Sequence, residues 1–125
     1  MTVGRCWALC AVASLFLSPI ASAQSPSDQV VRAVEAYDDL DLATAAGLIR
    51  RALAEEGTDA LPREERLRAL SYLGAAEFYR GNQDSVLSAF QRIVILDPRF
   101  QIDDVVFPPD VTSLFALVRR DTKVV

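Results

Sequence analysis

Histidine, cysteine and clustered carboxylates most often carry catalysis or bind metals, and this chain offers few of them. It has no histidine, and its only cysteines, Cys6 and Cys10, lie within a segment (residues 1–23) that we predict to be removed. The mature chain would then lack a thiol nucleophile, a thiolate ligand and a disulfide. Serine catalysis would need a base, and the only lysine, Lys123, lies in a tail that we expect to be frayed.

Two acidic clusters remain as candidates for metal binding or acid–base chemistry. The first, residues 38–41 (Asp-Asp-Leu-Asp), lacks the spaced ligands, central glycine and terminal glutamate of a calcium loop. The second, Asp103 and Asp104, is a pair of adjacent residues that would point apart in an extended segment, whereas a glycosidase needs two carboxyls facing one cleft. We therefore predict that both clusters are solvated and that the chain is no enzyme and holds no metal or cofactor. An enzyme of unrecognised type is the weakest alternative.

The arginine pairs at residues 50–51 and 119–120 raise the question of anion binding. Both pairs are expected late in helices, where arginine complements the negative end of the helix dipole and stays solvated. The whole chain carries 13 lysines and arginines against 17 acidic residues, a formal net charge of −4. An acidic chain with scattered arginines is not typical of proteins that bind nucleic acid, so we expect no nucleic-acid partner.

The first 23 residues have the pattern of a secretory signal peptide. The apolar run at residues 6–17 is shorter than the roughly 20 residues that cross a bilayer. Ala21 and Ala23 frame a small-x-small cleavage site, so the mature chain is predicted to begin at Gln24 and to have no membrane span. We expect an exported protein, periplasmic or secreted, with an uncleaved N-terminal anchor as the alternative.

Helices are the elements predicted to position any site, because apolar residues recur at spacings of three and four along most of residues 29–120. The predicted fold class is all-α. We expect the chain to be divided into a flexible leader at 24–28, helical hairpins at about 29–57 and 62–97, a C-terminal helix at about 109–120 and a frayed tail at 121–125. The segment at 100–107 is the one stretch that could be extended.

Capping and helix-breaking residues mark the predicted helix ends. Asp41 and Asn82 are residue types that cap helix N-termini. Gly57 and Gly81 are expected to end the preceding helices. Pro98 would prevent continuation of the helix before it, because proline lacks a backbone donor and clashes with the preceding turn.

The helices that follow the two predicted N-caps have the same apolar spacing, which indicates an internal repeat. Apolar residues lie 4, 8 and 11 positions after each cap. The two sets are Ala45, Ile49 and Ala52 after Asp41, and Val86, Phe90 and Ile93 after Asn82. Both helices are therefore expected to present the same face to their neighbours.

Residues 67–100 resemble a unit of the tetratricopeptide repeat family, whose helical hairpin has about 34 residues. The matching landmarks are Leu73 and Gly74 (a close helix approach), Gly81 (the turn), Phe90, and the closing Leu96, Asp97 and Pro98. The earlier hairpin matches only at Ala45, Ile49 and Ala52. The resemblance implies hairpins stacked as a short solenoid with a C-terminal capping helix, and an unrelated bundle of four or five helices is the alternative.

The same resemblance implies a non-enzymatic module that mediates protein–protein interaction or assembly in the cell envelope, with an unidentified polypeptide partner. In that family the first helix of each hairpin lines a concave groove. The candidate protein-binding residues on that helix are Arg68, Tyr72, Ala75 and Tyr79. Two alternatives remain open: these residues could pack against the neighbouring hairpin, and the chain could be a structural domain that self-associates as a homo-oligomer without a ligand.

Overall fold

The computed structural model describes residues 24–122, which form five α-helices and one short 3₁₀ turn, with no strand among them. In chain order the elements are α1 (Pro26–Asp38), α2 (Leu42–Ala54), η1 (Gly57–Asp59), α3 (Arg63–Arg80), α4 (Gln83–Leu96) and α5 (Pro109–Asp121). This confirms the predicted all-α class. The predicted signal peptide and the last three residues of the tail lie outside the described residues. No helix between residues 24 and 122 is long and apolar enough to cross a bilayer.

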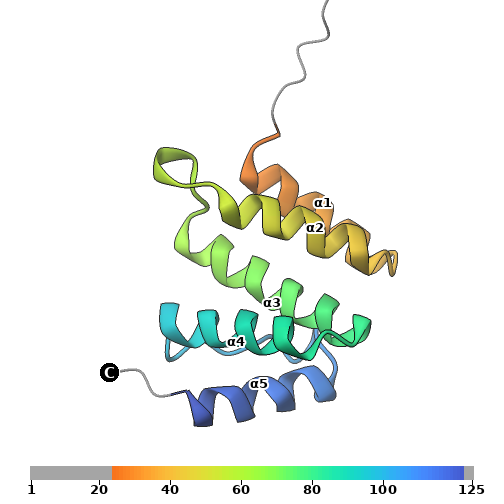
Figure 1. Ribbon diagram of the computed structural model, residues 1–125, viewed down its shortest axis with the longest axis vertical. Coiled ribbons are helices and arrows are strands. Elements are labelled where there is room, and N and C mark those ends of the chain that lie inside the picture. The colour runs from red at the N-terminus through yellow and green to blue at the C-terminus, as the bar shows by residue number, and fades with distance from the viewer. Residues whose placement is uncertain (1–23, 123–125) are drawn as a thin grey trace, which may run out of the picture.

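The helices pack in chain order around one core. Each helix contacts the next, and α3 also contacts both α1 and α5 (Figure 1). Buried apolar side chains from all five helices form a continuous cluster. Its members include Val30 of α1, Ile49 of α2, Leu70 of α3, Phe90 of α4 and Phe115 of α5. The helix α3 therefore lies at the centre of the molecule.

The predicted helix boundaries at Asp41, Gly81 and Pro98 are confirmed. Asp41 precedes α2, and its carboxylate accepts a hydrogen bond from the amide of Thr44. Gly81 follows α3 in the left-handed conformation, with φ of 79°. The helix α4 ends at Leu96, two residues before the proline.

The predicted flexible leader at 24–28 is too long, because α1 already begins at Pro26 and Ser25 caps it. Two further predictions, the helix end at Gly57 and the side-chain cap at Asn82, are wrong in detail. The helix α2 ends at Ala54, and Gly57, with φ of 71°, begins the following 3₁₀ turn instead of terminating the helix. Asn82 occupies the position before α4, but its side chain makes no capping hydrogen bond. Its amide nitrogen donates instead to a carboxylate oxygen of Glu77, at 2.5 Å. The Asn82 side chain, which was predicted to cap α4, thus binds the buried carboxylate of Glu77 instead.

The connection between α4 and α5, residues 97–108, is irregular and not a strand. Figure 1 shows it running back along α4, so that α5 begins near the end of the molecule where α4 also begins. Ile102 and Phe107 are buried in the core, while Val105 is exposed. The connection therefore contributes to the packed interior, although it has no regular structure.

Gly74 lies where α3 and α4 approach each other, as the sequence predicted. A Cβ atom at this position would lie 2.7 Å from Cδ1 and 2.9 Å from Cζ of Phe90. Phe90 is fully buried, so its ring cannot move away without displacing neighbouring core residues. Only glycine fits this contact.

Replacing Gly74 with alanine is expected to destabilise the protein by about 1–3 kcal/mol, because the added methyl group overpacks the contact with Phe90. Gly47 of α2 offers a matched control, since no heavy atom lies within 4 Å of a Cβ built there. Gly47→Ala should stabilise by about 0.5–1 kcal/mol through helix propensity. Urea unfolding measures the change in the free energy of unfolding for each variant, and the two changes should have opposite signs. Changes in the same direction would contradict the close contact between Gly74 and Phe90.

Candidate functional site

The predicted binding face on α3 is only partly accessible. Arg68 and Tyr79 are exposed, the latter by 49%, whereas Tyr72 is 7% exposed and Ala75 is fully buried. In this structure Ala75 offers no surface to a partner, and Tyr72 offers only a small one. For these two residues the packing alternative describes the structure, because α1 and the connection at residues 97–108 place side chains against α3.

Two aromatic rings from other elements cover Tyr72 on this part of α3. Tyr37 of α1 and Phe107 of the connection both meet Tyr72 edge-on, with ring centroids 5.2 Å and 5.0 Å away. Burial, together with the neighbouring Tyr79, Tyr72 and Asp38, raises the pKa of Tyr37 to about 12. Tyr37 therefore stays neutral in ordinary buffers, and this aromatic cluster acts as packing rather than as an acid or base.

A small pocket of about 360 Å³ lies beside this aromatic cluster, between α3 and the connection. Its walls include Arg68, Tyr72, Phe100 and Phe107. The Arg68 guanidinium lies 5.8 Å from the centroid of the Tyr72 ring, a cation–π geometry. Arg68 and Tyr72, two of the four predicted binding residues, thus share one pocket. Its other wall comes from the connection at residues 97–108, where no binding residue was predicted.

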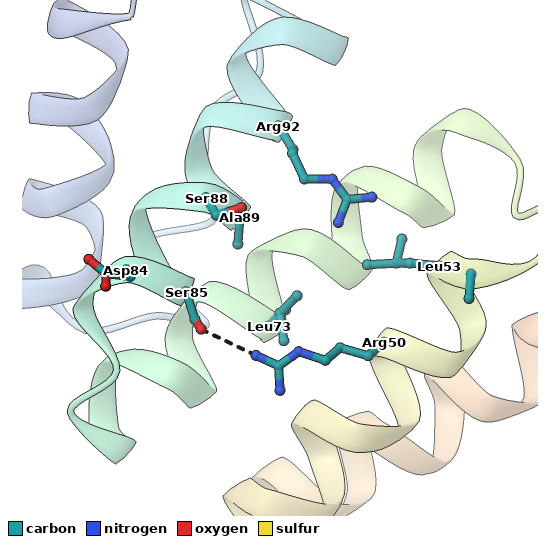
Figure 2. Close-up of a pocket in the computed structure, with 9 residues that line it drawn as sticks. Arg50, Leu53, Leu73, Asp84, Ser85, Ser88, Ala89 and Arg92 are labelled. Carbon is teal, nitrogen blue, oxygen red and sulfur yellow. Dashed lines mark hydrogen bonds between the residues drawn. The ribbon is translucent and has the colours of Figure 1, made fainter.

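A larger cleft, of about 540 Å³, opens between α2 and α4, and we call it the α2–α4 cleft. Figure 2 shows its lining side chains, with Leu73 of α3 between the two walls. The wall from α2 consists of Arg50, Leu53 and Ala54, and the wall from α4 consists of Asp84, Ser85, Ser88, Ala89 and Arg92. Guanidinium and hydroxyl donors therefore surround an apolar floor.

A buried carboxylate, Glu77 of α3, holds one of these arginines in place. Its side chain has no exposed surface, and its Oε1 lies 2.7 Å from Nη1 of Arg80 and 3.4 Å from Nη1 of Arg50. Burial is the largest single influence and raises the pKa of Glu77. The hydrogen bond from Asn82 and the charges of Arg50 and Arg80 together outweigh it, so the pKa lies below its ordinary value. Glu77 is therefore ionised at neutral pH.

The two guanidinium groups of the α2–α4 cleft come from opposite walls. Arg50 Nη2 donates a hydrogen bond to the hydroxyl oxygen of Ser85 at 3.4 Å, and this bond spans the cleft from α2 to α4 (Figure 2). Arg92 extends from α4 and forms none of the ion pairs found between residues 24 and 122. This arrangement can attract and hold a negatively charged group.

Both arginine pairs, which were predicted to be solvated, are divided by the structure, because the two members of each pair have different surroundings. Both residues of the first pair are exposed, but Arg50 pairs with Glu77 at the α2–α4 cleft, whereas Arg51 lines a different surface, between α1 and α2. In the second pair, Arg119 donates a hydrogen bond to the main-chain carbonyl of Phe100, while Arg120 is exposed. Sequence alone could not separate such neighbours, because tertiary packing decides which of them finds a partner.

The acidic clusters have structural roles. Asp41 caps α2, and the carboxylate of Asp103 accepts a hydrogen bond from the amide of Val105 at 2.9 Å. Among residues 24–122, no group of three or more acidic side chains lies close enough together to hold a metal ion. In comparisons with protein-family models, with curated proteins and with solved structures, nothing matches this chain. The functional proposal therefore rests on the geometry of the two pockets and on the packing of the helices.

Proposed function

We propose that this chain is a non-enzymatic helical-repeat module, similar to tetratricopeptide repeats, that binds a segment of another polypeptide. The order of helix packing supports a stack of hairpins. The helices α1 and α2 pack as one pair and α3 and α4 as the next, and the first helices of these pairs, α1 and α3, contact each other. The C-terminal helix α5 packs on both α3 and α4. Stacked hairpins of this kind present extended surfaces to a partner chain.

The observation that carries the proposal is the α2–α4 cleft, which lies between the two hairpins. It has a volume of about 540 Å³ and combines arginine and serine donors with an apolar floor. An extended peptide needs both, because its side chains provide apolar contacts and its carbonyl and carboxylate groups accept hydrogen bonds. The pocket beside Arg68, next to the buried Phe107, is smaller, at about 360 Å³.

We place this function in the cell envelope. The proposal of export rests on the signal-peptide pattern of residues 1–23, which lie outside the described residues. The mature protein would begin at Gln24. Without cysteine in residues 24–125, the domain suits an oxidising compartment.

Photo-crosslinking of the full chain in its native cells tests the proposed function. A photoreactive residue is placed in turn at Ser88 in the α2–α4 cleft, at Tyr79 on α3, and at Thr58 in η1 as an exposed control. We expect adducts with another polypeptide from one of the first two positions and not from the control. The intact mass of the recovered protein reports whether it begins at Gln24.

The alternative proposal is a structural domain that associates with itself. Exposed apolar side chains at Ile95 (64%) and Leu117 (47%) on the last two helices favour it. Crosslinks between copies alone, together with a mass that rises with concentration in light scattering, would replace partner binding with this alternative. An absence of any polypeptide adduct from Ser88 and Tyr79 would reject partner binding as proposed.

A further inference from the structure

The α2–α4 cleft is a site of positive charge on an acidic protein. The chain has a formal net charge of −4, yet two guanidinium groups lie in this one cleft. Figure 2 shows Arg50 and Arg92 extending into the space between the helices, whereas the carboxylate of Asp84 points away from both. Glu77 offsets part of the charge of Arg50, but it is shared with Arg80, so the cleft keeps a positive balance that the protein as a whole does not have.

Arg50 is positioned for binding before any partner arrives. Glu77 lies on one side of its guanidinium and Ser85 on another, both at 3.4 Å. Because a guanidinium has five N–H donors and the Arg50 side chain is 49% exposed, donors remain for a ligand. A side chain that is already held in place loses little conformational entropy on binding, which favours affinity.

Arg92 supplies the second charge. It forms no ion pair among residues 24–122, and its side chain reaches over the cleft toward Leu53 (Figure 2). A guanidinium binds a carboxylate through two parallel hydrogen bonds. Between the two arginines, Leu53, Leu73 and Ala89 provide apolar surface.

We propose that the α2–α4 cleft binds an acidic segment of a partner polypeptide. Carboxylates of that segment pair with Arg92 and Arg50, and an apolar side chain between them contacts Leu53 and Leu73. Charge complementarity identifies the occupant: the overall negative charge disfavours long polyanions such as nucleic acid, while the local arginines favour a short acidic stretch. This inference rests on the proposed function and names the class of partner.

Synthetic peptides test this assignment on the mature chain, residues 24–125. The probe is a labelled decapeptide that alternates leucine and aspartate, and its matched control carries asparagine in place of every aspartate. Fluorescence anisotropy gives the affinities, and amide chemical shifts locate the bound peptide. We expect only the acidic peptide to bind, with shifts at Ser85, Ser88 and Arg92, and binding should weaken with added salt.

Charge reversal at one cleft position provides the specific readout. Arg92→Glu should weaken binding by about tenfold or more, because attraction becomes repulsion. Arg51→Glu makes the same change in net charge on a surface that faces away from the cleft, and it should leave the affinity nearly unchanged. Thermal melting of both variants checks that they remain folded, as expected for exposed side chains.

Each contrary outcome has a distinct meaning. Equal weakening by the two variants, or shifts at the Arg68 pocket instead of the cleft, would overturn the assignment of the site but leave the proposed function intact. Equal binding of the asparagine peptide, or no binding of the acidic one, would overturn the acidic class of partner. A dimer that dissociates with Arg92→Glu would show that the cleft is occupied by a second copy. Failure of the proposed function itself is seen separately, in the crosslinking from Ser88 and Tyr79.

Discussion

Replacing Phe107 with alanine is expected to destabilise the protein by about 3–5 kcal/mol, the usual cost of removing a buried phenyl ring. Phe107 is only 4% exposed and lies against Tyr72 and Tyr37, with ring centroids 5.0 Å and 6.2 Å away. Its loss would leave a cavity between α1, α3 and the connection. For a domain of about 100 residues, the melting temperature should fall by about 10 °C or more.

Val105 provides a control within the same connection. It is 90% exposed, so Val105→Ala should change the free energy of unfolding by no more than about 0.5 kcal/mol. If Phe107→Ala melts like Val105→Ala, the connection is not packed on α3. Tyr72 would then be open to a partner, which is one of the two alternatives that the sequence left open. Comparing the two variants therefore decides whether the connection covers Tyr72 on α3.

Local sequence signals predicted the helices well because each depends on one residue and its immediate neighbours. Asp41 accepts a hydrogen bond from an amide three residues later, and Gly81 adopts a positive φ, and both effects can be inferred from residue type. Gly74 is a different case, since the close helix approach there was implied by the resemblance of Leu73 and Gly74 to the repeat family. Its contact with Phe90 extends that inference across two helices.

The path of the connection could not be predicted in the same way. Pro98 indicates that α4 must end, but it does not show where the following residues go. Ile102 and Phe107 are buried without any periodic spacing between them, so no pattern marks them as core. Because this segment packs on α3, the predicted binding residue Tyr72 became part of the interior.

The α2–α4 cleft was missed for a related reason. Arg50 and Arg51 are adjacent and chemically identical in the sequence, and only the fold brings one of them to Glu77. A signal did exist: Glu77 lies among the apolar and small residues of α3, where an ionisable side chain needs a partner if it is buried. That partner could not be named, because Arg50 is 27 positions away on another helix.

Removing the Glu77 side chain is expected to have the other large effect. Glu77→Ala should destabilise the protein by about 3 kcal/mol, near the lower end of the range for a broken buried ion pair. The lower end applies because Arg50 and Arg80, with side chains 49% and 35% exposed, can turn to water when the carboxylate is lost. Urea unfolding at neutral pH measures the change, and an exposed residue, Glu56→Ala, should give almost none.

The pH dependence of the free energy of unfolding shows whether Glu77 stabilises the protein through its charge or through its shape. The pKa of Glu77 in the folded protein lies below its ordinary value of 4.5, so ionised Glu77 contributes stability that is fully present above that value. This contribution is lost as the pH falls through the lowered pKa. Glu77→Gln keeps the volume of the side chain but cannot ionise. The stability difference between the wild type and Glu77→Gln should therefore be constant from pH 7 to about 4.5 and should shrink at lower pH. A difference that persists unchanged to pH 3 would show that it does not come from the charge of Glu77, and that Arg50 is not held at the cleft by charge.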